Sequence, residues 1–278
     1  MIAQADSISI SASGRRPAPA RIVQFASGKG GVGKTVLAAT LAHALAFRGE
    51  RVLLVDCDLG LANIDVQLGI SPAEDLAGVL AGAATLEQAV THVGGSAGPG
   101  DAPRGGFDVI AGSSGTGTLS ALPRGELARI REAIALIAGR YDRVIVDLGA
   151  GIDPSVTMFT ALPGPLLVVV TDEPTSLTDA YAFIKLAAMA RDTEAGPPDI
   201  RIVVNMAETP EAGRRTYDAL SRATASFLGL TPPLAGIVPR DAAVRDAIRH
   251  QMPLFARSPQ APAGAAVTRI AATLDGNR

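Results

Sequence analysis

The sequence predicts an α/β fold: a single doubly wound domain whose mostly parallel central sheet of about seven strands is covered by helices on both faces. Two observations predict this fold. Short runs of Val, Ile and Leu recur along the chain without alternating with polar residues, as strands buried on both faces do. Stretches with helical periodicity separate these runs, which is typical of strands that run parallel and are joined by crossover helices.

The expected strands share this nearly continuous apolar character, which distinguishes them from strands with one face in water. They are residues 21–26, 51–56, 107–112, 143–148, 165–171, 200–206 and 234–239.

The helical stretches place apolar residues three or four positions apart. The first has Leu37 and Leu41 on one face and stops at Gly49, a residue type that often follows helix C-termini. The last opens with Ser176, three positions before Asp179, which is close to a capping box and predicts that the helix begins there. The clearest helices are residues 35–48, 126–138 and 176–190.

The composition allows a large core and excludes several classes of protein. The chain has 278 residues, 47% hydrophobic and 19% charged, with a net charge of −2, which argues against nucleic acid as a partner bound by bulk charge. A single cysteine, Cys57, excludes an internal disulfide and a Cys-rich metal or iron–sulfur site, and fits a reducing cytosol. Because no apolar run approaches the roughly 20 residues that span a bilayer and no signal pattern opens the chain, we expect a cytoplasmic protein.

Two segments have the composition of flexible chain. Residues 1–20 are rich in Ser, Ala, Pro and Arg, and we expect a flexible N-terminal tail before a domain at 21–278. Residues 92–106 are rich in Gly and Pro and predict a mobile surface loop. The three histidines lack metal-ligand spacing, and His43, within an expected helix, should be structural.

Residues 28–35, GKGGVGKT, match the G-x-x-x-x-G-K-[ST] pattern of a phosphate-binding loop, between an expected strand and an expected helix. Glycines let backbone N–H groups approach phosphate oxygens, and the helix N-terminus adds partial positive charge. In this motif Lys34 reaches the β- and γ-phosphates and the Thr35 hydroxyl holds Mg²⁺. A glycine-rich turn without a ligand is the alternative. The remaining nucleotide-binding residues expected here are Gly28, Lys29, Gly30, Gly31, Val32, Gly33 and Val36.

Lysines are rare in this chain, yet two of them lie in this loop. Of the 25 lysines and arginines, three are lysines: Lys29, Lys34 and Lys185. The motif leaves the position of Lys29 open. A compact ammonium suits a point contact with phosphate, whereas the planar guanidinium of arginine demands paired acceptors. From the motif alone, a phosphate contact and a solvated loop lysine both remain open for Lys29.

Aspartates follow two of the expected strands. Asp56 and Asp58 end the second strand, and Asp147 ends the run RVIVD in the form of a Walker B strand. Ligands of open α/β sheets bind at the carboxyl ends of the strands, and phosphoryl transfer needs a carboxylate for Mg²⁺ and a group that orients water. Asp147 would hold Mg²⁺ through water, and Gly149 would let the following loop move when the γ-phosphate leaves. Solvated aspartates at a turn are the alternative for Asp56 and Asp58.

The loop sequence KGGVGKT resembles the deviant Walker A motif of the MinD/ParA class of P-loop ATPases. This resemblance implies ATP and ADP as ligands together with Mg²⁺. It implies that Lys34 contacts the nucleotide of its own subunit, whereas Lys29 reaches across an ATP-dependent homodimer to the other nucleotide. Asp58 would position the attacking water, and Asp56 would lie near the Mg²⁺ shell. The catalytic residues would then be Lys29, Lys34 and Asp58, and the metal-binding residues Thr35, Asp56 and Asp147.

Two further stretches resemble the base-binding segments of that class. Asn205, in VVNM, matches an asparagine that reads the adenine edge. The stretch IVPRD, residues 237–241, matches a loop that closes over the base mainly through backbone groups, which implies contacts from Pro239, Arg240 and Asp241.

Longer stretches resemble the FlhG/FleN type, the MinD-like ATPases that control flagellar number and placement. They are DLGLANIDVQLG (58–69), AGSSG (111–115), DEPTSLTDAYAFIK (172–185), VVNMAE (203–208) and RHQMPLFARSP (249–259). The resemblance implies a slow ATPase that acts as a switch on flagellar regulatory or assembly partners, either an SRP-type GTPase or a transcriptional activator. It leaves recruitment to a membrane or a cell pole open.

Two segments depart from that type. Residues 3–5, Ala-Gln-Ala, only remotely resemble the N-terminal segment with which such proteins stimulate a partner GTPase. The C-terminal stretch has an apolar stripe but little basic charge and no aromatic residue, whereas helices that bind membrane surfaces have both. We therefore expect a final helix that packs on the core, with direct membrane binding as the lesser alternative. The stripe consists of Val267, Ile270, Ala271 and Leu274.

Two other functions remain open. A ParA- or MinD-like organiser of DNA partition or of the division site would need a basic surface if it binds DNA. A P-loop ligase or amidase would need an acceptor site, for which the sequence shows no motif. The arginines that form one weak basic candidate are Arg214, Arg215, Arg222, Arg240, Arg245 and Arg249.

Overall fold

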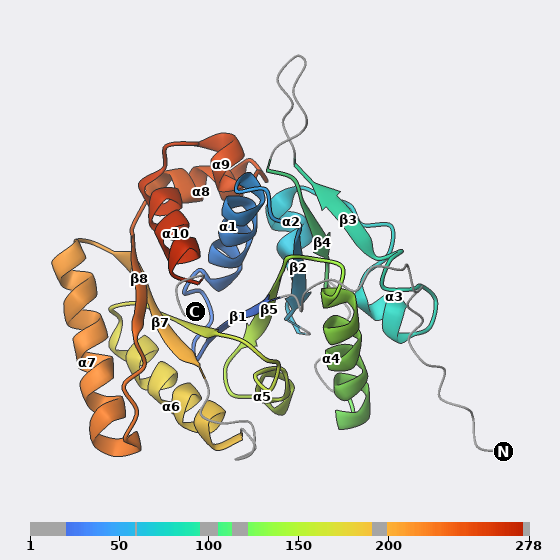
Figure 1. The fold of residues 1–278 in the computed structure, drawn as a ribbon. Coiled ribbons are helices and arrows are strands. Elements are labelled where there is room, and N and C mark those ends of the chain that lie inside the picture. The colour runs from blue at the N-terminus through green and yellow to red at the C-terminus, as the bar shows by residue number, and fades with distance from the viewer. Residues whose placement is uncertain (1–20, 59, 95–104, 113–121, 191–198, 275–278) are drawn as a thin grey trace.

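The computed structural model describes residues 21–58, 60–94, 105–112, 122–190 and 199–274. The strands are β1 (Arg21–Ser27), β2 (Val52–Cys57), β3 (Val90–Val93), β4 (Phe107–Ile110), β5 (Arg143–Ala150), β6 (Leu166–Val170), β7 (Ile200–Ala207) and β8 (Leu234–Pro239). They form one eight-stranded sheet in the order β3-β4-β2-β5-β1-β6-β7-β8 (Figure 1). Neighbouring strands run parallel except β3, which is antiparallel to β4.

Helices cover both faces of this sheet (Figure 1). One face carries α1 (Lys34–Phe47), α2 (Ile64–Leu68), α8 (Ala242–Arg249), α9 (Leu254–Arg257) and α10 (Pro262–Thr273). The other carries α3 (Leu76–Leu80), α4 (Arg124–Ala138), α5 (Pro154–Phe159), α6 (Pro174–Ala190) and α7 (Pro210–Leu228).

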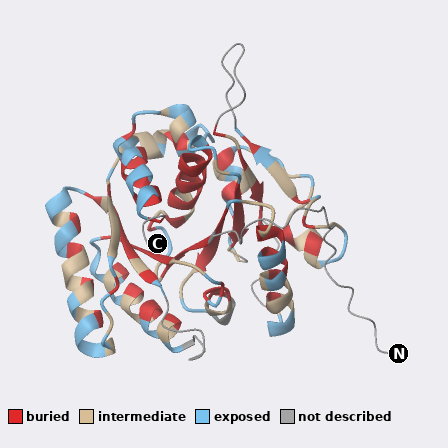
Figure 2. Ribbon diagram, in the orientation of Figure 1, coloured by how far each residue is buried: buried red, intermediate tan, exposed pale blue. Residues whose placement is uncertain are grey.

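Successive strand residues pack against opposite faces, so the sheet separates two apolar cores. In β1, Ile22 and Ala26 belong to the core that contains α4 to α7, whereas Val23 and Phe25 belong to the core that contains α1 and α10. Figure 2 shows buried residues along the strands and on α1. Burial on both faces is the reason that the strands are continuous apolar runs in the sequence. The predicted doubly wound α/β fold is confirmed.

The sheet contains one strand more than the sequence predicts. The additional strand, β3, lies at the edge of the sheet, and the first two residues of the predicted loop 92–106 belong to it, so the loop prediction is wrong there. Its sequence VTHV is mostly half-buried or exposed and lacks the apolar run that identifies the central strands. Residues 95–104 and the predicted tail, 1–20, lie outside the described residues.

The predicted C-terminus of α1 is confirmed, whereas the predicted N-terminus of α6 is wrong. Gly49 follows α1 with a left-handed φ of 86°, as predicted. Helix α6 begins at Pro174, two positions before the predicted cap, Ser176. The Ser176 hydroxyl instead accepts the backbone N–H of Thr171 at 3.0 Å and joins the helix to the end of β6. Proline suits a first helical turn because its φ is preset and its missing N–H needs no partner there.

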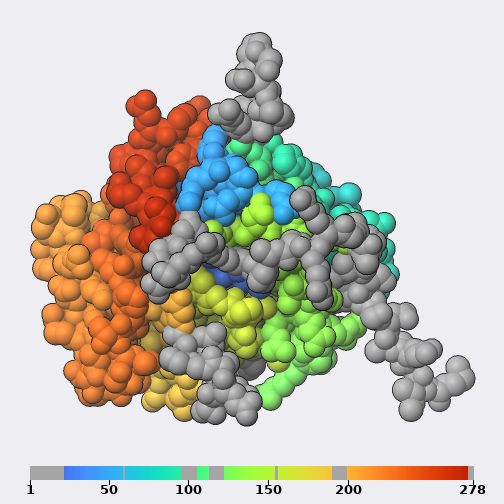
Figure 3. All heavy atoms as spheres, in the orientation of Figure 1, coloured from blue at the N-terminus to red at the C-terminus, as the bar shows by residue number. Residues whose placement is uncertain are grey.

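The last described helix packs on the core, as predicted. Val267, Ile270 and Ala271 of α10 are buried in the core that includes α1. Figure 3 shows the red C-terminal segment directly beside the blue segment of α1. Within the described residues, no helix is long and apolar enough to cross a membrane.

His43 lies inside an aromatic cluster at the far end of α1 from the phosphate loop. It is 3% exposed, and its ring stacks on Phe47 with centroids 4.6 Å apart. The ring centroids of Phe107 and Phe255 lie 5.7 and 5.6 Å from that of His43. These contacts agree with the structural role expected for His43.

Candidate nucleotide site

The glycine-rich motif forms the turn between β1 and α1. Helix α1 begins at Lys34, and the preceding Gly33 adopts a left-handed φ of 85°. Among the described residues no side chain caps this helix, and its first turn contains no acidic residue. The first N–H groups of α1 therefore remain available, which makes this N-terminus suited to an anion.

Close contacts require glycine at two positions of the loop. A Cβ on Gly28 would lie 2.2 Å from the backbone of Asp179 in α6. A Cβ on Gly33 would lie 2.5 Å from Nδ2 of Asn205, and this Nδ2 donates to the Val32 carbonyl at 2.8 Å. The loop is therefore held between α6 and β7. Asn205 contacts the loop itself, and its implied contact with adenine stays a prediction.

Lys34 is buried together with Asp147. The Lys34 Nζ lies 2.8 Å from Oδ1 of Asp147, and the two side chains are 7% and 0% exposed. Burial raises the pKa of Asp147, and the adjacent Lys34 ammonium opposes that shift. The other carboxylate oxygen, Oδ2, is buried and has no hydrogen-bond partner among the described residues. A buried oxygen of this kind is suited to a cation or to cation-bound water.

The carboxylate of Asp56 is used by the backbone of the following turn. Its Oδ1 accepts the N–H of Asp58 at 3.0 Å, and its Oδ2 accepts the N–H groups of Asn63 and Ile64 at 3.2 Å. Burial and the charge of Asp147 raise the pKa of Asp56 to about 7. The observed role of Asp56 is to hold the turn before α2, and its implied position near Mg²⁺ stays a prediction.

Asp58 lies at the open end of the same turn and lines the cavity described below. Its Oδ1 accepts the N–H groups of Gly60 and Leu61 at 3.3 and 3.0 Å. A Cβ on Gly149 would lie 3.4 Å from the same oxygen. The aspartate after β2 and the glycine of the Walker B segment, which are far apart in the sequence, therefore meet beside the phosphate loop.

Lys29 extends from the loop toward the start of α6. Its Nζ donates to Glu173 Oε2 and, at 2.8 Å, to Thr175 Oγ1. The Lys29 side chain is 36% exposed, and its ammonium holds the pKa of Glu173 below its usual value. Of the two loop lysines, Lys34 lines the cavity and Lys29 does not.

A cavity of 430 Å³ lies over the phosphate loop and the first turns of α1. The C-terminal ends of β7 and β8 and the segment that follows β8, together with α8 and α10, form one wall, and the Asp58–α2 segment forms another. The predicted site residues that line it are Gly30, Gly31, Val32, Gly33, Lys34, Thr35, Val36, Asp58, Asn205, Pro239, Arg240 and Asp241. Those outside the lining are Gly28, Lys29, Asp56, Asp147 and Gly149.

The sequence analysis missed several residues that line this cavity. Met206 lines it with a left-handed φ of 56°, where the register of β7 and β8 shifts. Positive φ is uncommon for a residue other than glycine. Gln67 of α2 and Arg245 of α8 also line the cavity. No local pattern identifies these residues, because the packing of β7, α2 and α8 around the loop decides their place.

The sequence matches the CobQ/CobB/MinD/ParA nucleotide binding domain over residues 23–254. This range contains the phosphate loop, both strand-end aspartate segments and Asn205. The chain belongs to this family. The MinD/ParA resemblance of the loop sequence is thereby confirmed, and a nucleotide is the ligand that the family shares.

Relatives of this MinD/ParA-family chain include flagellar and cell-division proteins. Antiactivator FleN of Pseudomonas aeruginosa is 37% identical over 257 residues, which cover 92% of this chain and 87% of FleN. Flagellum site-determining protein YlxH of Helicobacter pylori is 30% identical over 200 residues, which cover 72% of this chain and 63% of YlxH. The structure of septum site-determining protein MinD from Pyrococcus horikoshii, complexed with Mg-ADP, shares the fold with a TM-score of 0.69, 24% identity and coverage of 92% and 96% of the two chains.

The residues at this MinD/ParA-family site fit a nucleotide with Mg²⁺. The cavity-lining Thr35 would supply a hydroxyl ligand, and the unpartnered Oδ2 of Asp147 would hold Mg²⁺ through water. Magnesium is commonly held by one or two carboxylates together with water and substrate phosphates. Within the described residues no cluster of three or more His, Cys, Asp or Glu side chains could hold a metal ion.

Proposed function

We propose that this chain is an ATP-dependent switch that dimerises with Mg-ATP bound, hydrolyses ATP slowly and regulates flagellar number or placement through a partner protein. The observation that carries this proposal is the position of the two loop lysines relative to the cavity, which only one of them lines. Lys34 lines the cavity, whereas Lys29 is outside the lining and donates to Glu173, the residue directly before α6. A lysine on the surface beside the loop can contact a nucleotide held by a second subunit that faces it.

The residues inside the cavity have distinct roles in this proposal. Lys34 and the N-terminus of α1 stabilise charge on the β- and γ-phosphates. Thr35 through its hydroxyl and Asp147 through water would hold Mg²⁺, which would neutralise further phosphate charge. Asp58 accepts a hydrogen bond from the attacking water and orients it toward the γ-phosphate.

ATP controls dimerisation because only the triphosphate gives both subunits a group to share. A ligand shifts an equilibrium only by its difference in affinity for the two states. A γ-phosphate that is contacted by Lys34 of one subunit and Lys29 of the other stabilises the dimer, and ADP lacks this phosphate. Lys29 must exchange its contact with Glu173 for the phosphate. This exchange is feasible because an exposed ion pair is weak.

The flagellar output is supported by the relatives. YlxH is named for flagellum site determination and FleN is named an antiactivator, which favours regulation over a metabolic reaction. The partner is a flagellar regulatory or assembly protein, an SRP-type GTPase or a transcriptional activator. The N-terminal segment that would stimulate a GTPase lies outside the described residues.

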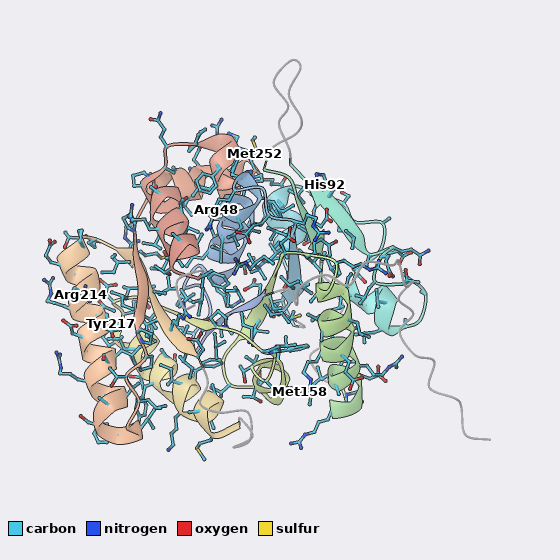
Figure 4. The ribbon with its side chains drawn as sticks, in the orientation of Figure 1. Arg48, His92, Met158, Arg214, Tyr217 and Met252 are labelled. Atoms are coloured by element: carbon cyan, nitrogen blue, oxygen red, sulfur yellow. The ribbon has the colours of Figure 1, made fainter. Side chains whose placement is uncertain are left out.

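A DNA-binding organiser of the same family is less well supported. Two of the candidate arginines have partners within the chain: Arg240 lies 3.4 Å from Glu208, and Arg214 lies over the ring of Tyr217 at 5.8 Å (Figure 4). The net charge is −2. Binding to duplex DNA that requires ATP and weakens steeply with salt would favour this function over the flagellar one.

Light scattering during size-exclusion chromatography tests the switch. The wild-type chain should be a monomer with Mg-ADP and a dimer with Mg-ATP. Lys29→Ala should bind Mg-ADP within about twofold of wild type, because it loses only an exposed contact, and should not dimerise. Lys185→Ala is the matched control, since Lys185 is an exposed lysine of α6. An ATP-dependent dimer of Lys29→Ala, or a wild-type chain that stays monomeric with ATP, contradicts the proposal.

A further inference from the structure

Helix α8 is followed by an unusual residue. Gln251 comes after the C-cap, His250, with a φ of 52°, in the left-handed region. After four other described helices this conformation belongs to glycines, namely Gly49, Gly69, Gly82 and Gly229, with φ of 86°, 65°, 72° and 65°. Glycine adopts this backbone more favourably than any residue with a side chain. Glutamine at position 251 is therefore not explained by the ending of the helix.

The side chain of Gln251 reaches across to α2. Its Nε2 donates to the Val66 carbonyl at 2.9 Å. The two backbones also approach closely, since a Cβ on Gly69, whose φ is 65°, would lie 2.7 Å from the carbonyl oxygen of Gln251. The next residue, Met252, is labelled at this corner of the molecule in Figure 4. We name Gln251, Val66 and Gly69 the α2–α8 clasp.

Helix α2 connects the α2–α8 clasp to the carboxylates at the end of β2. Its N-terminus is held by Asp56, which accepts the N–H groups of Asn63 and Ile64 and, on its other oxygen, the N–H of Asp58. Its C-terminus is held by Gln251. The helix has five residues, so its ends are only about 7 Å apart. A displacement of the clasp is therefore transmitted to the turn that carries Asp58.

The α2–α8 clasp also joins two walls of the nucleotide cavity. The wall on the α2 side contains Leu61, Asn63 and Gln67, and the wall on the α8 side contains Val244, Arg245 and Ile248. Apolar packing between these walls is incomplete, because a second cavity of 20 Å³ lies between α2 and α8. The hydrogen bond of Gln251, which joins residues 185 positions apart in the sequence, supplements that packing.

We propose that Gln251 is a positioning residue of the nucleotide site. It holds the α8 wall against α2, so that the cavity keeps its width and Asp58 keeps its place beside the phosphate loop. Gln251 itself is absent from the cavity lining, and it acts through the two helices. This inference rests on the proposed function, because it assumes that the cavity binds a nucleotide.

Gln251→Gly separates the side chain from the backbone, because glycine keeps the left-handed conformation and loses the amide. If Gln251 served only to end α8, the glycine variant would be at least as stable as wild type and would bind nucleotide equally well. We expect instead an equal or higher Tm together with a Kd for Mg-ADP that is raised about 3- to 10-fold, the effect of one lost hydrogen bond. Isothermal titration calorimetry and thermal unfolding measure the two quantities.

A second variant and a control complete the test. Gly69→Ala places a Cβ against the Gln251 carbonyl and should also raise the Kd for Mg-ADP. Gln260→Gly removes an exposed amide outside the cavity lining and should leave this Kd unchanged. At saturating ATP, the kcat of Gln251→Gly should fall as well, because the turn that carries Asp58 loses the support of the clasp.

The outcomes distinguish this inference from the proposed function. An unchanged Kd in both Gln251→Gly and Gly69→Ala overturns the inference, even if the wild-type chain dimerises and hydrolyses ATP. A raised Kd in these variants supports the inference, even if the wild-type chain binds Mg-ADP but does not respond to ATP, a result that contradicts the switch. A wild-type chain that binds no Mg-ADP overturns both.

Discussion

Lys29 and Lys34 lie five positions apart in one loop, yet their surroundings are opposite. Lys34 is 7% exposed and pairs with the buried Asp147, whereas Lys29 is 36% exposed and pairs with Glu173, which is 61% exposed. The buried pair is screened little by solvent, and the surface pair is screened strongly. The difference teaches that one loop can fix one charge in the interior and present another at the surface, where a weak ion pair leaves it exchangeable.

Removing the buried charge should produce the largest effect. Lys34→Ala leaves Asp147 buried without its cation, which should lower the free energy of unfolding by about 3–5 kcal/mol unless Asp147 takes up a proton. Affinity for Mg-ADP should fall on the order of 100-fold. Urea unfolding and calorimetry measure both quantities, with Lys185→Ala as the control. Near-normal affinity for Mg-ADP would show that the buried lysine does not serve the ligand.

Asp58→Ala separates hydrolysis from the binding that the two lysines provide. Both lysines remain in place, so Mg-ATP binding and dimerisation should persist. Phosphate release should slow by about 100-fold or more, because the attacking water loses its hydrogen-bond acceptor. Phosphate release and light scattering on the same sample provide the measurement. A variant that hydrolyses ATP at the wild-type rate would move the water-positioning role to another residue.

The contrast between buried and exposed side chains extends to the histidines. Burial lowers the pKa of His43 from 6.5 to about 4. Between these two pH values the imidazole is protonated in the unfolded chain and neutral in the folded chain. The contribution of neutral His43 to the free energy of unfolding is therefore complete above about pH 6.5. As the pH falls from there to about 4, this contribution is lost at roughly 1.4 kcal/mol per pH unit, or about 3 kcal/mol in total.

Urea unfolding of the wild type and of His43→Leu at pH 7 and at pH 4.5 checks this effect. The wild type should lose more stability than the variant over this range, and the titration of Asp56 is common to both proteins. His250→Leu is the control, since His250 is exposed. Equal losses in the wild type and in His43→Leu would show that His43 is charged in the folded chain.

The exposed contact of Lys29 should give the smallest effect. Glu173→Gln weakens the ion pair that keeps Lys29 on its own subunit, so ATP-dependent dimerisation should become easier by at most about fivefold. This gain should shrink as salt rises, because screening already weakens the pair. Sedimentation or light scattering over a range of protein concentrations measures the dimer affinity. Weaker dimerisation in Glu173→Gln would mean that Glu173 helps the dimer and does not compete with it.

Much of the fold and of the loop could be predicted from the sequence. Strands buried on both faces must be apolar throughout, so runs such as 143–148 identify β5 without any tertiary information. The edge strand β3 escaped prediction because it is mostly half-buried or exposed. The spacing of Ser176 to Asp179 predicts a helix cap, but the Ser176 hydroxyl accepts the N–H of Thr171, since several local conformations can use the same side chain.

The sequence by itself determined the phosphate loop and the strand-end aspartates, because glycine spacing and apolar runs act within a few residues of the chain. Only the tertiary structure decided the partners of the polar groups. Glu173 is 144 positions from Lys29, Asn205 is 173 positions from Val32, and Gln251 is 185 positions from Val66. Such contacts depend on how the helices pack around the sheet, and the packing free energy is shared among many residues, so no local pattern specifies them.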